Sequence, residues 1–164
     1  MKRTVAWLMV ILALVGCLTG CNKKKEFPGG EMPEIPGLKV SCGLKSVDAL
    51  RGQYVWRYEN EELRDDSVPT QFRKDEMPCF EVSGGKEVKL KFDVEPLEVR
   101  VTYWSTDAWE DFSAEGGEIV LYENSFTVGE EDTIYEIWAR WQGNDSEGGT
   151  LSGNVYYSFY TDVK

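Results

Sequence analysis

Adjacent carboxylates are the groups in this sequence that could most directly carry out acid–base chemistry. A pair of Asp or Glu side chains can serve as general acid and general base in the hydrolysis of a glycosidic bond. Such neighbours occur in the following runs: Glu61-Glu62, Asp65-Asp66, Asp75-Glu76, Glu110-Asp111 and Glu130-Glu131-Asp132. Most of these runs lie in predicted loops, where acidic side chains are ordinarily solvated. The sequence therefore indicates a protein that is not an enzyme.

The composition excludes several other chemistries. The 164 residues include no histidine, so the chain has no Ser-His-Asp or Cys-His pair and no imidazole metal ligand. Its 18 Lys and Arg residues against 29 Asp and Glu residues give a net charge of −11, which opposes binding to nucleic acid. The loop 143–149 (GNDSEGG) offers oxygen ligands for Ca²⁺, but it lacks the spacing of a calcium-binding loop, and we interpret it as a hairpin connection. We expect no metal, no cofactor and no nucleic-acid partner.

The N-terminus has the pattern of a secretory leader. A short positive segment precedes a run of apolar and small residues at 5–16, which is too short for a permanent membrane span. Two motifs follow, LVGC ending at Cys17 and LTGC ending at Cys21, and each resembles the bacterial lipobox. The resemblance implies that the cysteine thiol receives a diacylglyceryl group and becomes the mature N-terminus. We expect lipidation at Cys21, with Cys17 as the alternative.

These features divide the chain into three parts. Residues 1–21 are a predicted lipoprotein signal peptide. Residues 22–36 (NKKKEFPGGEMPEIP) are rich in Lys, Gly and Pro and are predicted to be a flexible tether. Residues 37–164 are predicted to be a single domain.

The domain has the sequence pattern of an all-β protein. Apolar residues recur with a period of two in short runs separated by Gly, Pro, Asp and Asn. The runs predict strands within 54–58, 88–94, 99–104, 119–121, 126–128, 134–141 and 155–160. About seven strands with turn signals every 8 to 12 residues favour a two-layer antiparallel β-sandwich. The segment 132–135 (DTIY) resembles the tyrosine corner of immunoglobulin-like domains, so we expect an immunoglobulin-like sandwich.

Aromatic residues give the clearest signal of a binding surface. On the last two predicted strands one face carries core-like residues, and Trp56 also belongs to the predicted core. Four aromatic residues are predicted to point outward and to form one patch: Trp104, Trp138, Tyr156 and Tyr160. Such a patch suits stacking on sugar rings or docking of a protein partner. The alternatives are aromatic pairing that merely shields the sheet, and cover by the chain's own loop around Trp109 and Phe112.

Two cysteines remain in the domain if Cys21 carries the lipid. An extracytoplasmic setting allows Cys42 and Cys79 to form a disulfide. Two separate buried thiols are the alternative.

Several segments together resemble a group of small immunoglobulin-like lipoproteins of Gram-positive, Clostridia-type bacteria. These segments are the lipobox, Cys42-Gly43, 47–56 (VDALRGQYVW), 66–69 (DSVP), 94–96 (VEP), 99–101 (VRV) and 135–141 (YEIWARW). The resemblance implies an extracytoplasmic protein, anchored to the cell membrane by lipid, with a binding or sensing role. We therefore expect a non-enzymatic module that binds a protein or a cell-envelope component, or alternatively a carbohydrate-binding accessory lipoprotein.

Overall fold

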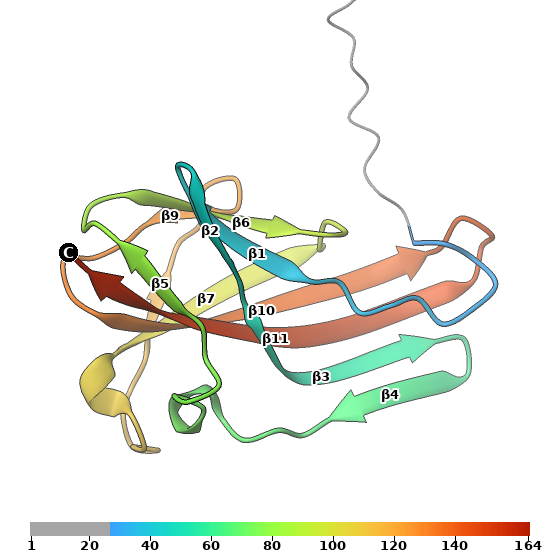
Figure 1. Ribbon diagram of the computed structural model, residues 1–164. Helices are drawn as coiled ribbons and strands as arrows, with labels where there is room; N and C mark the ends of the chain where they lie inside the picture. The colour runs from blue at the N-terminus through green and yellow to red at the C-terminus, as the bar shows by residue number, and fades with distance from the viewer. Residues whose placement is uncertain (1–26) are drawn as a thin grey trace, which may run out of the picture.

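A computed structural model describes residues 27–164, which form eleven β-strands and two short 3-10 turns (Figure 1). Four of the strands make sheet A: β1 (Leu38–Cys42), β2 (Lys45–Asp48), β6 (Glu87–Phe92) and β9 (Ser125–Thr127). They follow the order β2-β1-β6-β9, and every neighbouring pair is antiparallel. No helix within the described residues is long and apolar enough to cross a bilayer.

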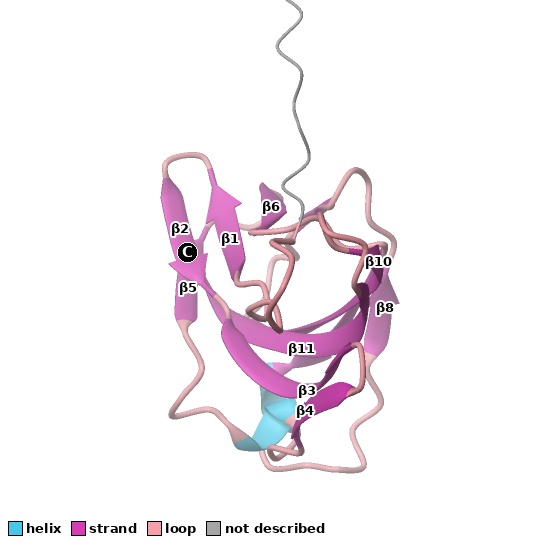
Figure 2. Ribbon diagram, turned by 90° about the vertical axis from the view of Figure 1, so that its right-hand side faces the viewer, coloured by secondary structure: helices cyan, strands magenta, loops and turns pink. Residues whose placement is uncertain are grey.

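The other seven strands make sheet B. They are β3 (Leu50–Tyr58), β4 (Glu61–Asp65), β5 (Cys79–Val82), β7 (Glu98–Ser105), β8 (Gly117–Ile119), β10 (Thr133–Asn144) and β11 (Thr150–Val163). Six of them follow the antiparallel order β4-β3-β11-β10-β7-β8, while β5 adds to the far part of β11 in parallel. In Figure 2 the long strands of sheet B lie beneath β1 and β6 of sheet A.

The predicted all-β class with two largely antiparallel sheets is confirmed. Each of the seven predicted strand regions overlaps a strand, although the region 119–121 shares only Ile119 with β8, and the last two strands pair along their length. The sequence interpretation missed four strands, β1, β2, β4 and β5.

The core lies between the sheets and is rich in aromatic residues. The ring of Phe92 on β6 meets Trp141 and Tyr157 of sheet B at centroid distances of 5.9 and 6.1 Å. Phe126 on β9 likewise contacts Tyr135 on β10 at 5.1 Å. The predicted inward face of the last two strands is confirmed, and Trp56 is fully buried as expected.

Residues 27–36 pack against the sandwich. The ring of Phe27 meets Trp56 edge to face at 5.6 Å. Trp56 Nε1 donates a hydrogen bond to the Pro33 carbonyl oxygen at 2.9 Å, and the hydroxyl of Tyr157 donates to the carbonyl oxygen of Pro36. Both donors are buried, so they need acceptors, and this segment supplies them. The structure therefore differs from the predicted flexible tether over these ten residues, while the predicted leader, both lipobox cysteines and residues 22–26 lie outside the described part of the chain.

One irregularity of sheet B shapes the outer surface. Val155 pairs with Tyr54, but Tyr157 pairs with Arg51, so the two residues Gly52 and Gln53 of β3 stand opposite Tyr156 alone. This arrangement is a β-bulge, and bulges redirect side chains locally. Here it places Gln53 beside Tyr156 on the outer side of the sheet.

Candidate functional site

The outer face of sheet B carries the four aromatic residues of the predicted patch. Trp138 is registered with Tyr156 on β11, and Ile134 is registered with both Trp104 and Tyr160. Residues opposite one another in an antiparallel pair project to the same side of the sheet. The structure therefore places the predicted patch residues on one face, and all four are half-buried.

Two loops cover one end of this face. The first contains the 3-10 turn η1 (Thr70–Phe72) and the second contains η2 (Thr106–Ala108), and both turns lie on the side of sheet B away from sheet A (Figure 2). The loops touch each other through the rings of Phe72 and Phe112 at 4.1 Å. They thus form one cap over the sheet.

The cap contacts two of the four aromatic residues. Trp104 Nε1 donates to the Ala114 carbonyl oxygen at 3.2 Å, and the Trp109 ring meets Tyr160 edge to face at 5.8 Å. Ile134, between Trp104 and Tyr160, is fully buried. For this half of the patch the structure shows cover by the loop around Trp109 and Phe112, as the alternative interpretation expected.

Trp138 and Tyr156 lie outside the cap, and we call them the aromatic pair. They are direct cross-strand neighbours. The guanidinium of Arg100 lies 5.1 Å from the centre of the Trp138 ring, a cation–π contact that holds the ring in place. The aromatic pair is the part of the predicted patch for which residues 27–164 show no ring contact or hydrogen bond with the cap.

A polar cavity of about 240 Å³ lies between Tyr156 of the aromatic pair and the cap. Its walls include Gly52, Gln53, Val68, Pro69, Thr70, Gln71, Arg73, Trp104, Glu136, Tyr156, Tyr157 and Ser158. Glu136 is the one carboxylate in this wall, and it projects from β10 between Ile134 and Trp138.

Few hydrogen-bond donors and no cation compensate the Glu136 carboxylate for its burial among the described residues. The hydroxyl of Thr70 donates to Glu136 Oε2, and among residues 27–164 no Lys or Arg forms an ion pair with this carboxylate. Arg73, which lines the same cavity, is held by Glu76 at 2.9 Å and by the Arg51 carbonyl oxygen at 3.2 Å. Burial raises the pKa of Glu136, and the Thr70 hydrogen bond opposes this only in part. A carboxylate in this state is typical of a binding or reactive site.

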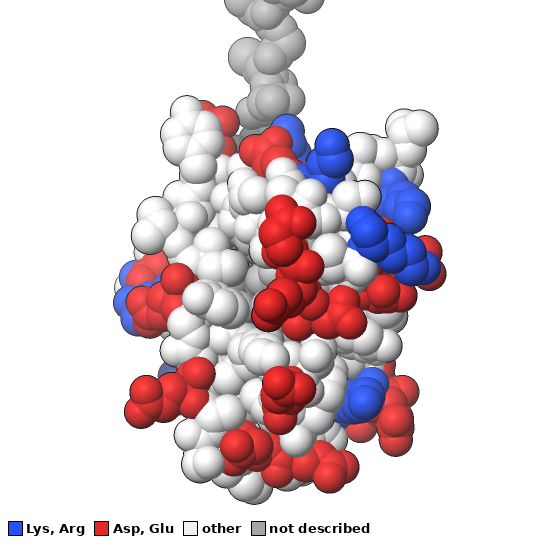
Figure 3. All heavy atoms as spheres, turned by 90° about the vertical axis from the view of Figure 1, so that its left-hand side faces the viewer, with Lys and Arg blue, Asp and Glu red and all other residues white. Residues whose placement is uncertain are grey.

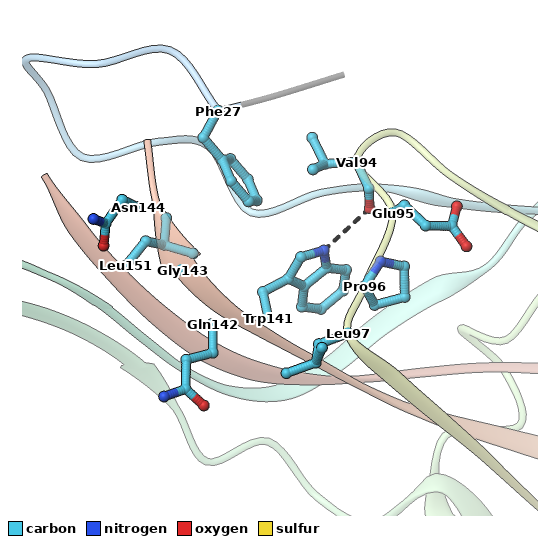
Figure 4. A pocket seen from close by; sticks show the side chains of 10 residues that line it. All are labelled: Phe27, Val94, Glu95, Pro96, Leu97, Trp141, Gln142, Gly143, Asn144 and Leu151. Carbon is cyan, nitrogen blue, oxygen red and sulfur yellow. Dashed lines mark hydrogen bonds between the residues drawn. The ribbon is translucent and has the colours of Figure 1, made fainter. Parts of the chain in front are cut away.

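A second pocket of about 310 Å³ lies at the end of the sandwich where Phe27 enters (Figure 4). Its walls are mainly apolar and are formed by Phe27, Val94, Glu95, Pro96, Leu97, Trp141, Gln142, Gly143, Asn144 and Leu151. Trp141 Nε1 donates to the Val94 carbonyl oxygen at 3.1 Å, so the polar atom of this ring is already used. In Figure 4 the carboxylate of Glu95 points away from the other lining side chains. The pocket therefore offers packing surface but few groups that could orient a ligand.

The other candidate groups occupy structural positions. The acidic runs are exposed, and several pair with nearby arginines, such as Glu62 with Arg57 at 2.6 Å and Asp66 with Arg64 at 2.8 Å. Of the segment 143–149, residues 145–149 form the β10–β11 hairpin connection, and Gly143 and Asn144 end β10.

The centre of that hairpin is Asp145. Its carboxylate accepts hydrogen bonds from the Tyr58 hydroxyl at 2.7 Å and from the backbone N–H groups of Glu147 and Gly149 at 2.8 Å. These bonds, with that of Tyr58 the largest, lower the pKa of Asp145. Both carboxylate oxygens of Asp145 therefore already accept hydrogen bonds that stabilise the hairpin connection.

Cys42 and Cys79 are separate free thiols in the structure. Cys42 ends β1 in sheet A and is half-buried, whereas Cys79 begins β5 in sheet B and is exposed. Cys79 is registered with Tyr160 and faces outward with it, away from the space between the sheets.

Sequence reasoning missed the residues that make the cavity, chiefly Glu136, Thr70 and Gln53. The available signal was a single carboxylate between large apolar side chains of one strand face, since Glu136 alternates with Ile134 and Trp138. The contribution of Thr70 has no such signal, because it depends on how its loop folds over the sheet.

No family model matches the sequence, and no curated protein and no solved structure matches it.

Proposed function

We propose that this protein is an extracytoplasmic lipoprotein that binds or senses a protein or cell-envelope component through the outer face of sheet B. The observation that carries the proposal is the aromatic pair outside the cap, in which Trp138 is the cross-strand neighbour of Tyr156 and Tyr156 lines a polar cavity. Large flat rings next to hydrogen-bonding groups are typical of binding surfaces. The lipobox resemblance supports the anchor, and the anchor would raise the local concentration of a weak binding face.

The wall of the cavity lends no support to hydrolysis by paired carboxylates. Hydrolysis by paired carboxylates needs a general acid and a second carboxylate within about 5 to 10 Å. Within the described residues the cavity wall holds Glu136 alone. This favours binding over hydrolysis at this site.

Carbohydrate binding is the second candidate. It is favoured by the same juxtaposition, since sugar rings stack on aromatic faces while their hydroxyls need partners such as Gln53, Thr70 and Ser158. The immunoglobulin-like topology and the relationship to Clostridia-type lipoproteins remain part of the proposal.

Loss of either ring of the aromatic pair should weaken partner binding. We expect Trp138→Ala and Tyr156→Ala in the full chain to lose about tenfold or more in affinity, the scale of a central aromatic contact. Binding is measured on a glycan array and on isolated cell envelopes. Tyr122→Ala is the matched control, because Tyr122 is 74% exposed and lies outside this face. Partners and affinities that stay unchanged in both variants would contradict the proposed surface.

The membrane anchor should depend on one cysteine. In cells labelled with a fatty-acid probe, the wild-type protein should carry the label and Cys21→Ala should lose it, because that thiol is the proposed attachment point. Cys17→Ala is the matched control and should keep the label. An unlabelled wild-type protein would refute the anchor, and loss of label only in Cys17→Ala would move the attachment site to Cys17.

A further inference from the structure

We propose that the polar cavity binds the free ammonium group of an amino sugar, with Glu136 as the carboxylate that receives it. This inference rests on the proposed function and specifies the ligand of the same face.

The first ground is the unmet bonding capacity of Glu136. An ionised carboxylate accepts hydrogen bonds at about four positions, and Thr70 is the one donor that occupies any of them among the described residues. A partly buried carboxylate without a cation costs free energy of folding. A ligand that brings a positive N–H donor into the cavity would offset that cost, whereas a neutral ligand would offset it less.

The second ground is the rest of the wall. Trp104 and Tyr156 flank the cavity, and Glu136 lies close enough to Tyr156 to help burial raise the pKa of that phenol. Aromatic faces beside a carboxylate attract ammonium groups through cation–π contacts. Arg73 also lines the cavity, and its guanidinium is paired with Glu76 at 2.9 Å.

The third ground distinguishes an amino sugar from a lysine side chain. A lysine stem has four methylene groups and needs apolar walls, but this wall carries the amide of Gln53 and the hydroxyls of Thr70 and Ser158. These groups suit ring hydroxyls. The volume of about 240 Å³ is large enough for one hexose unit, and the ring of Tyr156 in the cavity wall can stack on a following unit.

The long-range field favours a cationic ligand as well. The chain has a net charge of −11. Figure 3 shows Asp and Glu scattered over one end of the molecule, while Lys and Arg gather along one side of it. A negative surface attracts cations and raises their local concentration.

The test compares glucosamine with glucose and with N-acetylglucosamine. The full-length protein in detergent micelles is titrated with each sugar at neutral pH, and the indole N–H signal of Trp104 is followed by NMR. Glucosamine should bind at least about tenfold more tightly than either neutral sugar, because only glucosamine carries a positive charge that can pair with the Glu136 carboxylate. Equal affinities, or no binding of glucosamine, would overturn the inference.

Two variants assign the effect to Glu136. Glu136→Gln keeps the shape of the side chain and should abolish the preference for glucosamine. Glu118→Gln removes the same charge in the same row of the sheet but at an exposed position outside the cavity, and it should keep the preference. A preference that survives in Glu136→Gln, or that disappears equally in both variants, would also overturn the inference.

Folding of the Glu136→Gln variant can be checked in the same samples. Because burial raises the pKa of Glu136 in the folded state, the folded protein holds the proton more tightly than the unfolded chain. The stability that this carboxyl contributes is therefore present at low pH and is lost as the pH rises through the raised value. Glu136→Gln should melt at or above the wild-type temperature at neutral pH, so a loss of binding in this variant would not reflect unfolding.

Three further outcomes separate the amino-sugar assignment, the cavity assignment and the proposed function from one another. If Nα-acetyllysine amide binds as tightly as glucosamine, the site recognises a lysine side chain and the amino-sugar assignment is overturned. If glucosamine fails to bind while envelope binding still depends on Trp138, the cavity assignment fails and the proposed function stands. If glucosamine binds through Glu136 but no partner depends on the aromatic pair, the proposed surface fails instead.

Discussion

Replacing Trp56 by alanine should lower the free energy of unfolding by about 3–5 kcal/mol, the usual cost of removing a large aromatic side chain from a core. Trp56 is fully buried, and its ring meets Phe27 and Trp141 at 5.6 Å each. Its Nε1 also holds the Pro33 carbonyl oxygen. The substitution therefore leaves a cavity and an unpaired acceptor at the same point, and it should loosen residues 27–36.

Urea denaturation of the wild type and the variant measures this loss. Trp56→Phe fills most of the same space but lacks the indole N–H. It therefore separates the effect of the cavity from the effect of the lost hydrogen bond, and it should lower the free energy of unfolding less than Trp56→Ala does. Limited proteolysis should cut within residues 27–36 sooner in both variants. A loss below about 1.5 kcal/mol in Trp56→Ala would contradict the packing described here.

A single methyl group at Gly153 should have an effect of similar size. Gly153 on β11 is registered with Trp56, and an added Cβ would overlap the indole ring. The ring is buried on all sides and cannot move aside without displacing Phe27 or Trp141. We expect Gly153→Ala to destabilise the domain by about 2–3 kcal/mol, the upper range for overpacking in a core.

A second glycine and a double variant give the controls for this prediction. Gly129 is exposed and an added Cβ there meets no atom within 4 Å, so Gly129→Ala should be nearly neutral. In a Trp56→Ala background the space around residue 153 is empty, so Gly153→Ala should then cost far less than it does alone. Equal costs in the two backgrounds would show that the clash is not with Trp56.

The strands that the sequence predicted are those that bury one face. β6, β10 and β11 alternate apolar and polar residues because one side of each lies on the core. β4 (EELRD) was missed because all five of its residues are exposed and it owes its conformation to pairing with β3. β2 and β5 have four residues each, too few to display a period clearly. Whether such short segments form strands depends on their hydrogen-bonded pairing with other strands. This pairing cannot be read from a single sequence.

The same limit explains what was and was not predicted at the candidate site. Alternation along β10 and β11 was enough to place Trp138 and Tyr156 on an outer face. The cap was only one of several alternatives, since its loops are more than 30 residues apart in sequence and meet through Phe72 and Phe112. The composition of residues 27–36 suggested a free segment, but buried donors on Trp56 and Tyr157 bind its carbonyl groups.

The docked segment limits how far the hairpin end of the domain could lie from a membrane. In a chain lipidated at Cys21, six Cα-to-Cα steps separate the acylated residue from Phe27, a span of at most about 22 Å. Phe27 is held at the hairpin between β10 and β11, where its carbonyl oxygen accepts from the Ser146 N–H at 3.2 Å, and the C-terminus lies at the opposite end of the molecule (Figure 1). The hairpin end would therefore rest near the lipid headgroups. The outer face of sheet B would then be roughly perpendicular to the bilayer surface, where it can contact other proteins on the same membrane.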